Sequence, residues 1–316
     1  MRYYSILIFT LVHFLCFSQS NDFKTIVKKA YAFENKENYA EAKKLFQAQE
    51  NSKLFSTREK IFITNYIVFY NYLLEEDTDI KKVDKILNIY YSLQNRNTYE
   101  TELLLNLFSS KYHNVAGEIG WQEALDIAEK GYKIKDFNQA KLETRTDYLY
   151  DLGYLYDKVG NSFEGIKFYK KSLALYVKQF GENTTDVALN YNNLAYAYTN
   201  VYNQKSTIAY YEKAAKIWEI VYKDTIDNKD YLVTVYHNLV YQYINYGDLE
   251  KAQINLTKLN NYFFTKYKTT ESKKELRYFL SFSDFCLSNI RMNLALNKKE
   301  NALKFLRDFE ENQFLP

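Results

Sequence analysis

Residues 152–172 read LGYLYDKVGNSFEGIKFYKKS, and this stretch decides the fold. The pattern of its first five letters returns as LAYAY at 194–198 and as LVYQY at 239–243. Ala195 lies 42 residues after Gly153, and Val240 lies 45 residues after Ala195. Recurrence at a nearly fixed spacing indicates a repeat protein, in which each unit packs only on its neighbours. The sequence therefore predicts a tandem array.

Within each unit, small residues recur where two antiparallel helices would cross. Gly153 and Gly165 fill both such places in the first unit, while Ala195 and Ala252 fill one place in each of the next two. Large side chains, mostly tyrosines, stand beside these small residues and would fill the space around a close contact. Each unit is therefore expected to be a helical hairpin.

Helix ends are marked inside the same units. The pairs Gly160-Asn161 and Gly247-Asp248 combine a residue that ends one helix with a residue that caps the next. The turn of each hairpin is therefore expected at these positions.

Weaker copies extend the pattern over most of the chain, giving about seven antiparallel hairpins. A clear fourth copy lies near the N-terminus, degenerate copies follow it, and one more hairpin lies near the C-terminus; the residues that mark them are Ala30, Phe33, Tyr39, Ala42, Phe46, Asn71, Val83, Leu87, Ser109, Tyr112, Trp121, Ala124, Ala128, Leu294, Ala302, Leu306 and Phe309. The expected fold is an all-α, right-handed α-solenoid. Residues 19–135 form its partly degenerate part, 136–268 its clear array, and 269–316 a C-terminal capping hairpin.

The composition agrees with an all-helical chain. Only 8 glycines and 1 proline occur in 316 residues, although β-sandwiches, barrels and Gly-rich nucleotide-binding folds use both residue types constantly. The formal net charge is +3, with no long basic run, so nucleic acid is not expected as a partner.

The N-terminus has the features of a secretory signal peptide. Arg2 precedes an apolar run from Ile6 to Phe17, and Cys16 and Ser18 stand at a plausible cleavage site. We expect residues 1–18 to be a signal peptide, and the protein to be exported from a bacterial cell and to be periplasmic or secreted. An uncleaved anchor is the alternative, and it would be the chain's only membrane contact. Cleavage removes Cys16 together with the signal peptide, so Cys286 would have no partner for a disulfide within the chain. Cys286 is expected to be a small buried hydrophobe.

The hairpin offsets resemble those of the tetratricopeptide repeat, although the period exceeds the usual length of about 34 residues. Residues 181–188, GENTTDVA, lead into NNLA at 192–195, and this run resembles kinesin-light-chain repeats. The chain departs from that family by lacking the His-Pro of the linker and the proline that usually ends a repeat.

The resemblance implies a concave groove lined by the first helix of each hairpin, where asparagines contact the main chain of a bound peptide. Carried over to this sequence, the candidate peptide-binding residues are Asp151, Tyr154, Asp157, Asn192, Asn193, Tyr196, Asn200, His237, Asn238, Tyr241 and Asn245. The alternative is structural: the asparagines could bond to a neighbouring helix, and the tyrosines could reflect the composition of the chain.

Signatures of catalysis are absent from the sequence. His113 and His237 lie in no nucleophile or zinc motif, and no phosphate-binding loop occurs. We therefore expect no enzyme activity, no cofactor and no metal.

The expected function is a scaffold that binds a peptide segment of a partner protein; the identity of the partner and the oligomeric state stay open. One alternative is a sensory array that acts in trans with a separate effector, such as a CHAT-type protease or a sensor kinase. A second alternative is a helical-repeat protein that binds glycans through its tyrosines.

Overall fold

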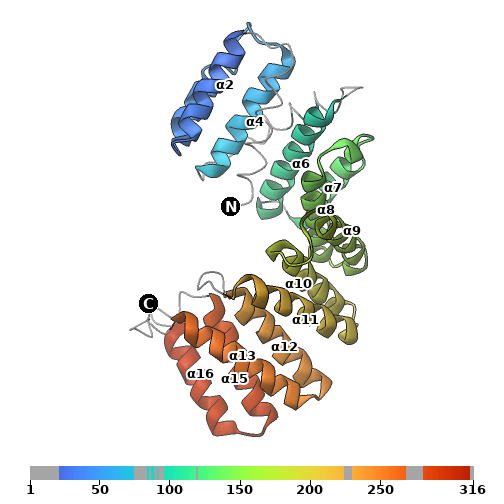
Figure 1. Ribbon diagram of the computed structural model, residues 1–316, viewed down its shortest axis with the longest axis vertical. Helices are drawn as coiled ribbons and strands as arrows, with labels where there is room; N and C mark the ends of the chain where they lie inside the picture. Colours follow the sequence, from blue (N-terminus) through green and yellow to red (C-terminus); the bar gives the residue numbers. More distant parts are fainter. Residues whose placement is uncertain are drawn as a thin grey trace. The chain divides into compact units, whose positions relative to one another are not determined.

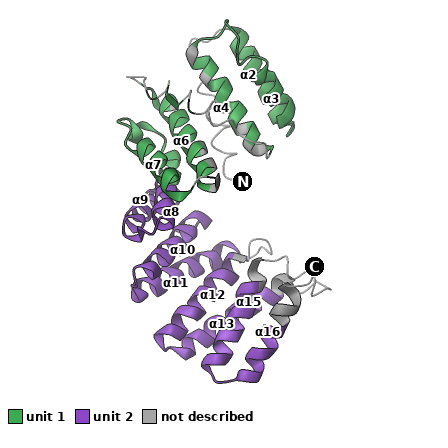
Figure 2. Cartoon of the chain, turned by 180° about the vertical axis from the view of Figure 1, so that it is seen from behind, with its two compact units in different colours: residues 1–148 green, residues 149–316 purple. Residues whose placement is uncertain are grey.

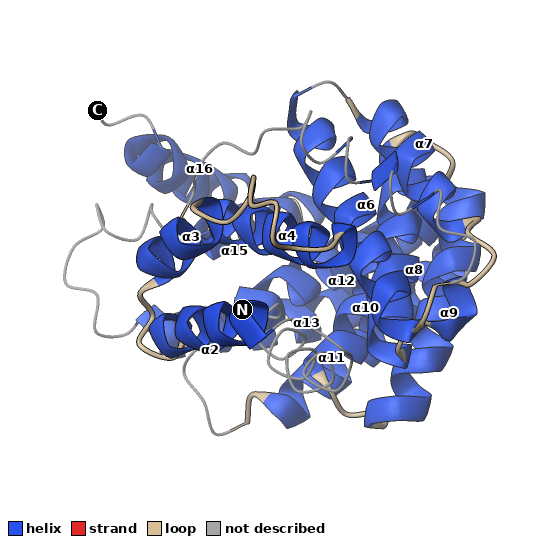
Figure 3. Ribbon diagram, turned by 90° about the horizontal axis from the view of Figure 1, so that it is seen from above, coloured by secondary structure: helices blue, strands red, loops and turns tan. Residues whose placement is uncertain are grey.

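The computed structural model describes most of the chain after residue 20. The described residues are 21–74, 84, 87–88, 91, 96–118, 120–223, 230–267 and 280–313. The expected signal peptide, residues 1–18, lies outside them, as do Val83 and the side chain of Phe309. All regular secondary structure within these ranges is helical, without a strand (Figure 3). The prediction of an all-α chain of paired helices is confirmed.

The chain divides into two compact units, residues 1–148 and 149–316 (Figure 2). Unit 1 contains α2 (Asn21–Glu34), α3 (Tyr39–Gln47), α4 (Thr57–Leu73), α6 (Thr98–Glu118), α7 (Trp121–Tyr132) and the short 3-10 helix η1 (Phe137–Gln139). Helix α8 (Leu142–Lys158) begins in unit 1 and ends in unit 2. Helix α2 packs on α3, as the clear N-terminal copy predicted, and α6 packs on α7, as one of the degenerate copies predicted.

Unit 2 continues with helices that pack in sequential pairs (Figure 1). They are α9 (Ser162–Phe180), α10 (Thr185–Asn200), α11 (Gln204–Val221), α12 (Asp230–Tyr246), α13 (Leu249–Tyr267), α15 (Leu280–Ala295) and α16 (Lys299–Gln313). The pairs are α8 with α9, α10 with α11, α12 with α13, and α15 with α16. Within the described ranges, no helix is both long enough and apolar enough to cross a membrane.

The crossing of α8 and α9 leaves no room for a side chain at its two glycines. A Cβ on Gly153 would lie 2.7 Å from the ring of Tyr169, and one on Gly165 would lie 2.9 Å from the carbonyl oxygen of Gly153. The predicted close approach is thus confirmed. Gly131 does the same in unit 1, since a Cβ there would lie 2.9 Å from the ring of Phe108.

The turn inside five of the hairpins has one backbone geometry. Each turn contains a residue with positive φ, and these residues are Glu37 (55°), Gly160 (82°), Tyr202 (58°), Gly247 (84°) and Asn297 (57°). In four of these turns the next residue, Asn38, Asn161, Asn203 or Asp248, accepts a hydrogen bond from a backbone N–H in the first turn of the following helix. The sequence predicted this turn at the two glycines, and the structure extends it to three other residue types.

The repeats are held together by large buried side chains. In unit 2 one core runs from Tyr176 to Met292 and includes Trp218, Tyr236 and Cys286. Cys286 is fully buried and forms no disulfide, as predicted. A separate core in unit 1 joins α2, α3 and α4 through edge-to-face contacts of Phe23 and Phe46 with Phe62. Packing of aromatic rings thus stabilises both units.

Candidate functional site

The first helices of three hairpins in unit 2 each carry a tyrosine at the same register. Tyr154 of α8, Tyr196 of α10 and Tyr241 of α12 are 37%, 54% and 39% exposed. The leucines one or two positions before or after them, such as Leu155, Leu194 and Leu239, are buried. Because helix periodicity keeps these tyrosines out of the core, they form an exposed row, here called the tyrosine ladder.

Cations lie over the rings at both ends of the tyrosine ladder. The Lys158 ammonium lies 5.1 Å from the centre of the Tyr154 ring. The Arg291 guanidinium lies 4.6 Å from the centre of the Tyr241 ring. Both separations are within the range of a cation–π interaction, which helps to hold the two rings in place.

Asparagines connect α10 to α8. The Asn193 side-chain amide donates to the hydroxyl of Tyr150 at 2.5 Å, and Asn200 donates to the carboxylate of Asp157 at 2.9 Å. The Asn192 amide donates to the side-chain oxygen of Asn193 at 3.3 Å. The Asn193 side chain therefore bonds to the neighbouring helix, which is the structural alternative raised from the sequence. Its amide nitrogen and its oxygen are both already engaged in hydrogen bonds within the chain.

Asn192 keeps an unused acceptor. Its side-chain oxygen is shielded from solvent and accepts no hydrogen bond from any described residue. A buried polar atom without a partner is unusual in a folded protein.

The side chain of His237 connects α12 to α15. Its Nδ1 lies 3.1 Å from the carbonyl oxygen of Asp284, which can only accept, so Nδ1 carries the proton; it lies 2.8 Å from the hydroxyl of Ser288. Burial lowers the pKa of His237 below its ordinary value; the charge of Arg291 adds to this effect and that of Asp284 opposes it. His237 is therefore neutral at physiological pH and fixes the junction of two repeats.

Two further candidates lie beside the ladder on α12. Asn238 is half-buried and Asn245 is exposed, and neither makes a side-chain hydrogen bond to another residue in the described part of the chain. Asp151 is half-buried on α8, one turn before Tyr154. Of the eleven candidates, Asn238 and Asn245 are thus the amides most available to an external ligand.

Helix α15 adds residues that the sequence reasoning did not select. Thr234 of α12 donates to the Asp284 carboxylate at 2.8 Å, and Arg291 covers Tyr241. Arg291 stands 50 residues after Tyr241, the same spacing that separates Ala302 from Ala252. This spacing was the available signal, because it places Arg291 at the register of the ladder in the fourth hairpin.

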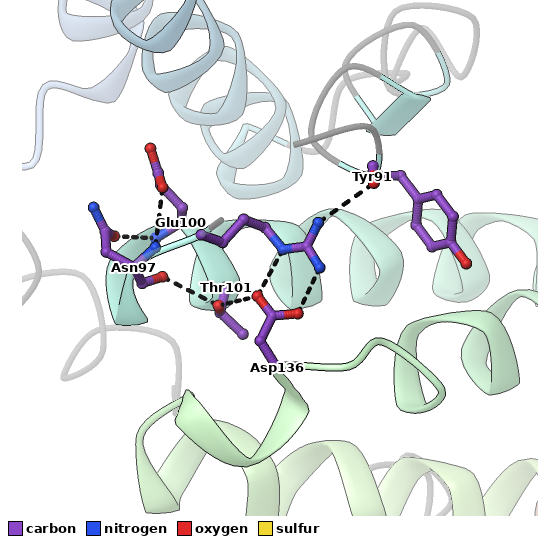
Figure 4. A network of polar contacts seen from close by, with 6 residues as sticks. Tyr91, Asn97, Glu100, Thr101 and Asp136 are labelled. Carbon is purple, nitrogen blue, oxygen red and sulfur yellow. Dashed lines mark hydrogen bonds and ion pairs between the residues drawn. The ribbon is translucent and has the colours of Figure 1, made fainter. Parts of the chain in front are cut away.

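A second polar cluster lies buried in unit 1 (Figure 4). Arg96 donates two hydrogen bonds to the Asp136 carboxylate, at 2.7 and 2.5 Å, and Thr101 donates a third at 2.7 Å. Burial acts to raise the pKa of Asp136, but the bonds from Arg96 and Thr101 outweigh it and hold the pKa below its ordinary value. Asn97 and Glu100 bond reciprocally at the start of α6.

This cluster has a structural role. Lys141, just before α8, donates its backbone N–H to Glu102 of α6 at 2.9 Å and forms an ion pair with the same carboxylate at 3.2 Å. Together with the Arg96–Asp136 pair, this contact holds the linker between α7 and α8 against α6. Nowhere in the described ranges do three or more His, Cys, Asp or Glu residues gather as a metal site would require.

Comparison with known proteins agrees with this geometry. Residues 188–227, which cover most of α10, all of α11 and the segment that follows, match the tetratricopeptide repeat family. No curated protein sequence matches the chain significantly.

Several solved structures share the fold at low sequence identity. The crystal structure of BtubC (BKLC) from P. vanneervenii is 17% identical, with a TM-score of 0.55 over 76% of this chain and 95% of that one. A putative kinesin light chain of Podosopora anserina with nearly identical TPR-like repeats is 16% identical, with a TM-score of 0.53 over 67% of this chain and 97% of that one. A signal transduction ATPase with a tetratricopeptide repeat sensor, from Pyrococcus horikoshii, is 17% identical, with a TM-score of 0.66 over 92% of this chain and 41% of that one.

Solenoids of this type present extended binding surfaces and are typical of non-enzymatic scaffolds for protein interactions. The paired helices, the small residues at their crossings, the repeated turn and the family match all lead to one assignment. The chain has the fold of tetratricopeptide-repeat proteins, which it shares with structures of the kinesin-light-chain-like type, and residues 188–227 match the tetratricopeptide repeat family.

Proposed function

We propose that the protein is a scaffold that binds an extended peptide segment of a partner along the first helices of unit 2. The observation that carries this proposal is the tyrosine ladder. Three rings at one register are 37–54% exposed, although burying them would stabilise the fold. A ligand that follows the ladder would find a flat apolar face at each repeat.

Polar groups beside the ladder fit the main chain of such a ligand. Asn238 and Asn245 each offer one acceptor and two donors. Arg291 and Asp284 would extend the site to the fourth hairpin. Asn193 and His237 would act indirectly, since their hydrogen bonds to the neighbouring helices position the surface.

The experiment uses the full chain to select ligands from an unbiased library of displayed peptides, and then compares variants for affinity. Tyr196→Ala combined with Asn238→Ala should weaken a selected peptide at least tenfold, because truncation of a central aromatic anchor typically costs more than about 1.4 kcal/mol. Ile254→Ala is the matched control, since Ile254 is 52% exposed on α13 and lies outside the first helices. Equal affinity of both variants, with helicity unchanged, would contradict the proposal.

A regulatory array acting in trans is the second candidate. Its support is the structural similarity to the Pyrococcus horikoshii ATPase, whose tetratricopeptide repeats are described as a sensor. The chain spans 41% of that protein. Co-purification of the chain with an effector encoded beside it, lost in the Tyr196→Ala variant, would favour this role over a general scaffold.

Binding of a glycan to the tyrosine ladder is the third candidate. It would be favoured if a glycan array gave a signal while peptide selection gave none. Export through residues 1–18 also stays a proposal, and N-terminal sequencing of the protein recovered from the cell envelope tests it.

A further inference from the structure

The most exposed large apolar side chains of unit 2 lie at one kind of place. Among the described residues they are Tyr202, Phe163 and Tyr246, which are 96%, 70% and 63% exposed. Each lies in, or directly beside, the turn between the two helices of a hairpin. The turn of the fourth hairpin carries Leu294 and Leu296, which are 55% and 36% exposed.

These turns follow one another along one edge of unit 2. The bond from Asn200 to Asp157 joins the ends of α10 and α8, directly before their turns. The bond from Gln204 to the backbone oxygen of Gln242, at 3.3 Å, joins the start of α11 to the end of α12. The contact of Arg291 with Tyr241 joins α15 to α12. The exposed side chains therefore form a row, here called the turn edge.

Tyr202 occupies a backbone position that disfavours it. Its φ of 58° is in the left-handed region, where the equivalent residues are Gly160, Gly247 and Asn297. A large side chain at such a position costs stability, and residues of this kind concentrate at functional sites. Because the ring is almost fully exposed, packing within the chain does not explain its presence.

The arrangement of the turn edge favours a lipid surface over a protein partner. Polar caps such as Asn161, Asn203 and Asp248 separate the apolar side chains, so the edge lacks the continuous dry centre of a stable protein interface. The interfacial layer of a bilayer accepts separate tyrosine, phenylalanine and leucine side chains, since water and headgroups remain available to the polar groups between them.

The charge of the turn edge indicates how it would bind. Five lysines and four carboxylates lie in the segments 158–164, 200–206, 245–251 and 294–300, namely Lys158, Lys205, Lys251, Lys298, Lys299, Glu164, Asp248, Glu250 and Glu300. Charges of both signs nearly balance.

We propose that the turn edge inserts its apolar tips into the interfacial layer of a lipid bilayer, and that insertion depends little on the charge of the lipid. This role is separate from peptide binding by the tyrosine ladder.

Tryptophan fluorescence in the full chain tests the proposal. Tyr202→Trp and Ile254→Trp place a reporter on the turn edge and on α13, against the same background of Trp121 and Trp218. Vesicles of bromine-labelled phosphatidylcholine, with or without phosphatidylglycerol, should quench the added fluorescence at position 202 several-fold more than at position 254. Equal quenching at the two positions overturns the proposal, whether or not another segment holds the chain at the vesicle.

A second reporter tests whether the tips act together. Leu296→Trp should lose most of its quenching when Phe163, Tyr202 and Tyr246 are all changed to Ser. It should keep its quenching when the exposed Phe180, Ile220 and Ile254 are changed instead. The reverse pattern overturns the proposal. The proposal is also overturned if neither variant shows quenching and the chain self-associates in a concentration-dependent way that only the turn-edge variant abolishes. That result would assign the turn edge to contact with a second copy of the chain.

Discussion

Replacing Tyr202 by glycine should make the protein more stable. Tyr202 has a φ of 58°, its side chain is 96% exposed, and its backbone N–H bonds to the carbonyl oxygen of Thr199 at 3.0 Å. Glycine adopts this backbone conformation without a steric penalty and keeps the hydrogen bond. The change therefore removes strain and loses almost no packing.

The expected size follows from two opposing terms. A non-glycine residue in the left-handed region costs roughly 1–2 kcal/mol. Glycine loses about 0.5–1 kcal/mol more conformational entropy on folding than a residue with a side chain. The midpoints of the two ranges leave a net gain for Tyr202→Gly of about 0.75 kcal/mol, equivalent to a rise in melting temperature of about 1.5–3 °C for a large chain.

Gly160 and Gly247 supply the matched controls. Their φ values are 82° and 84°, and a Cβ at either position would meet no atom within 4 Å. Gly160→Ala and Gly247→Ala should therefore destabilise the chain by about 1 kcal/mol through the backbone alone. Urea unfolding, followed by circular dichroism, measures the free energy of unfolding of all three variants. The comparison holds when the dependence of this free energy on urea concentration is the same in each variant. The reasoning would be refuted if Tyr202→Gly unfolded at a lower urea concentration than the wild type while Gly160→Ala and Gly247→Ala unfolded at the same concentration as the wild type.

Three further changes test the packing and the buried charges. Gly153→Ala should destabilise unit 2 by about 1–3 kcal/mol, because the new methyl group would press on the Tyr169 ring; a melting temperature equal to that of the wild type would show that the α8–α9 crossing can relax. Asp136→Ala should cost about 3–5 kcal/mol, because it leaves the Arg96 guanidinium buried without its partner. Glu129→Ala, which removes a largely exposed pair with Lys133, should cost less than about 1 kcal/mol in the same denaturation assay, and equal losses would contradict the buried role of Asp136. Burial raises the pKa of Glu34 from 4.5 to about 7, so folding favours its neutral form; this stabilising effect is complete below pH 4.5 and is lost as pH rises through about 7. Glu34→Gln should therefore raise the melting temperature above about pH 7 and leave it unchanged below about pH 4.5, and a pH-independent effect would contradict this assignment.

Local signals in the sequence were sufficient for the fold. Gly153 and Gly165 identify a helix crossing because only the absence of a side chain allows the backbones to approach, and Asn161 and Asp248 identify helix starts because their side chains cap backbone N–H groups. These interactions join residues close in sequence or related by the repeat. Their spacing alone was therefore enough to predict paired helices, and likewise the register that exposes Tyr154, Tyr196 and Tyr241.

Contacts between distant residues were decided only by the tertiary structure. The sequence did not reveal that Asn193 donates to Tyr150, that His237 bonds to α15, or that Arg96 pairs with Asp136, since each contact joins residues 40 or more positions apart. Side-chain amides and charges bond to whatever lies within reach, and that depends on how helices stack. The periodicity of the sequence thus determined which side chains of this protein lie outside its core. The stacking of the helices determined which of those side chains are already bonded to a neighbouring helix and which remain available to a ligand.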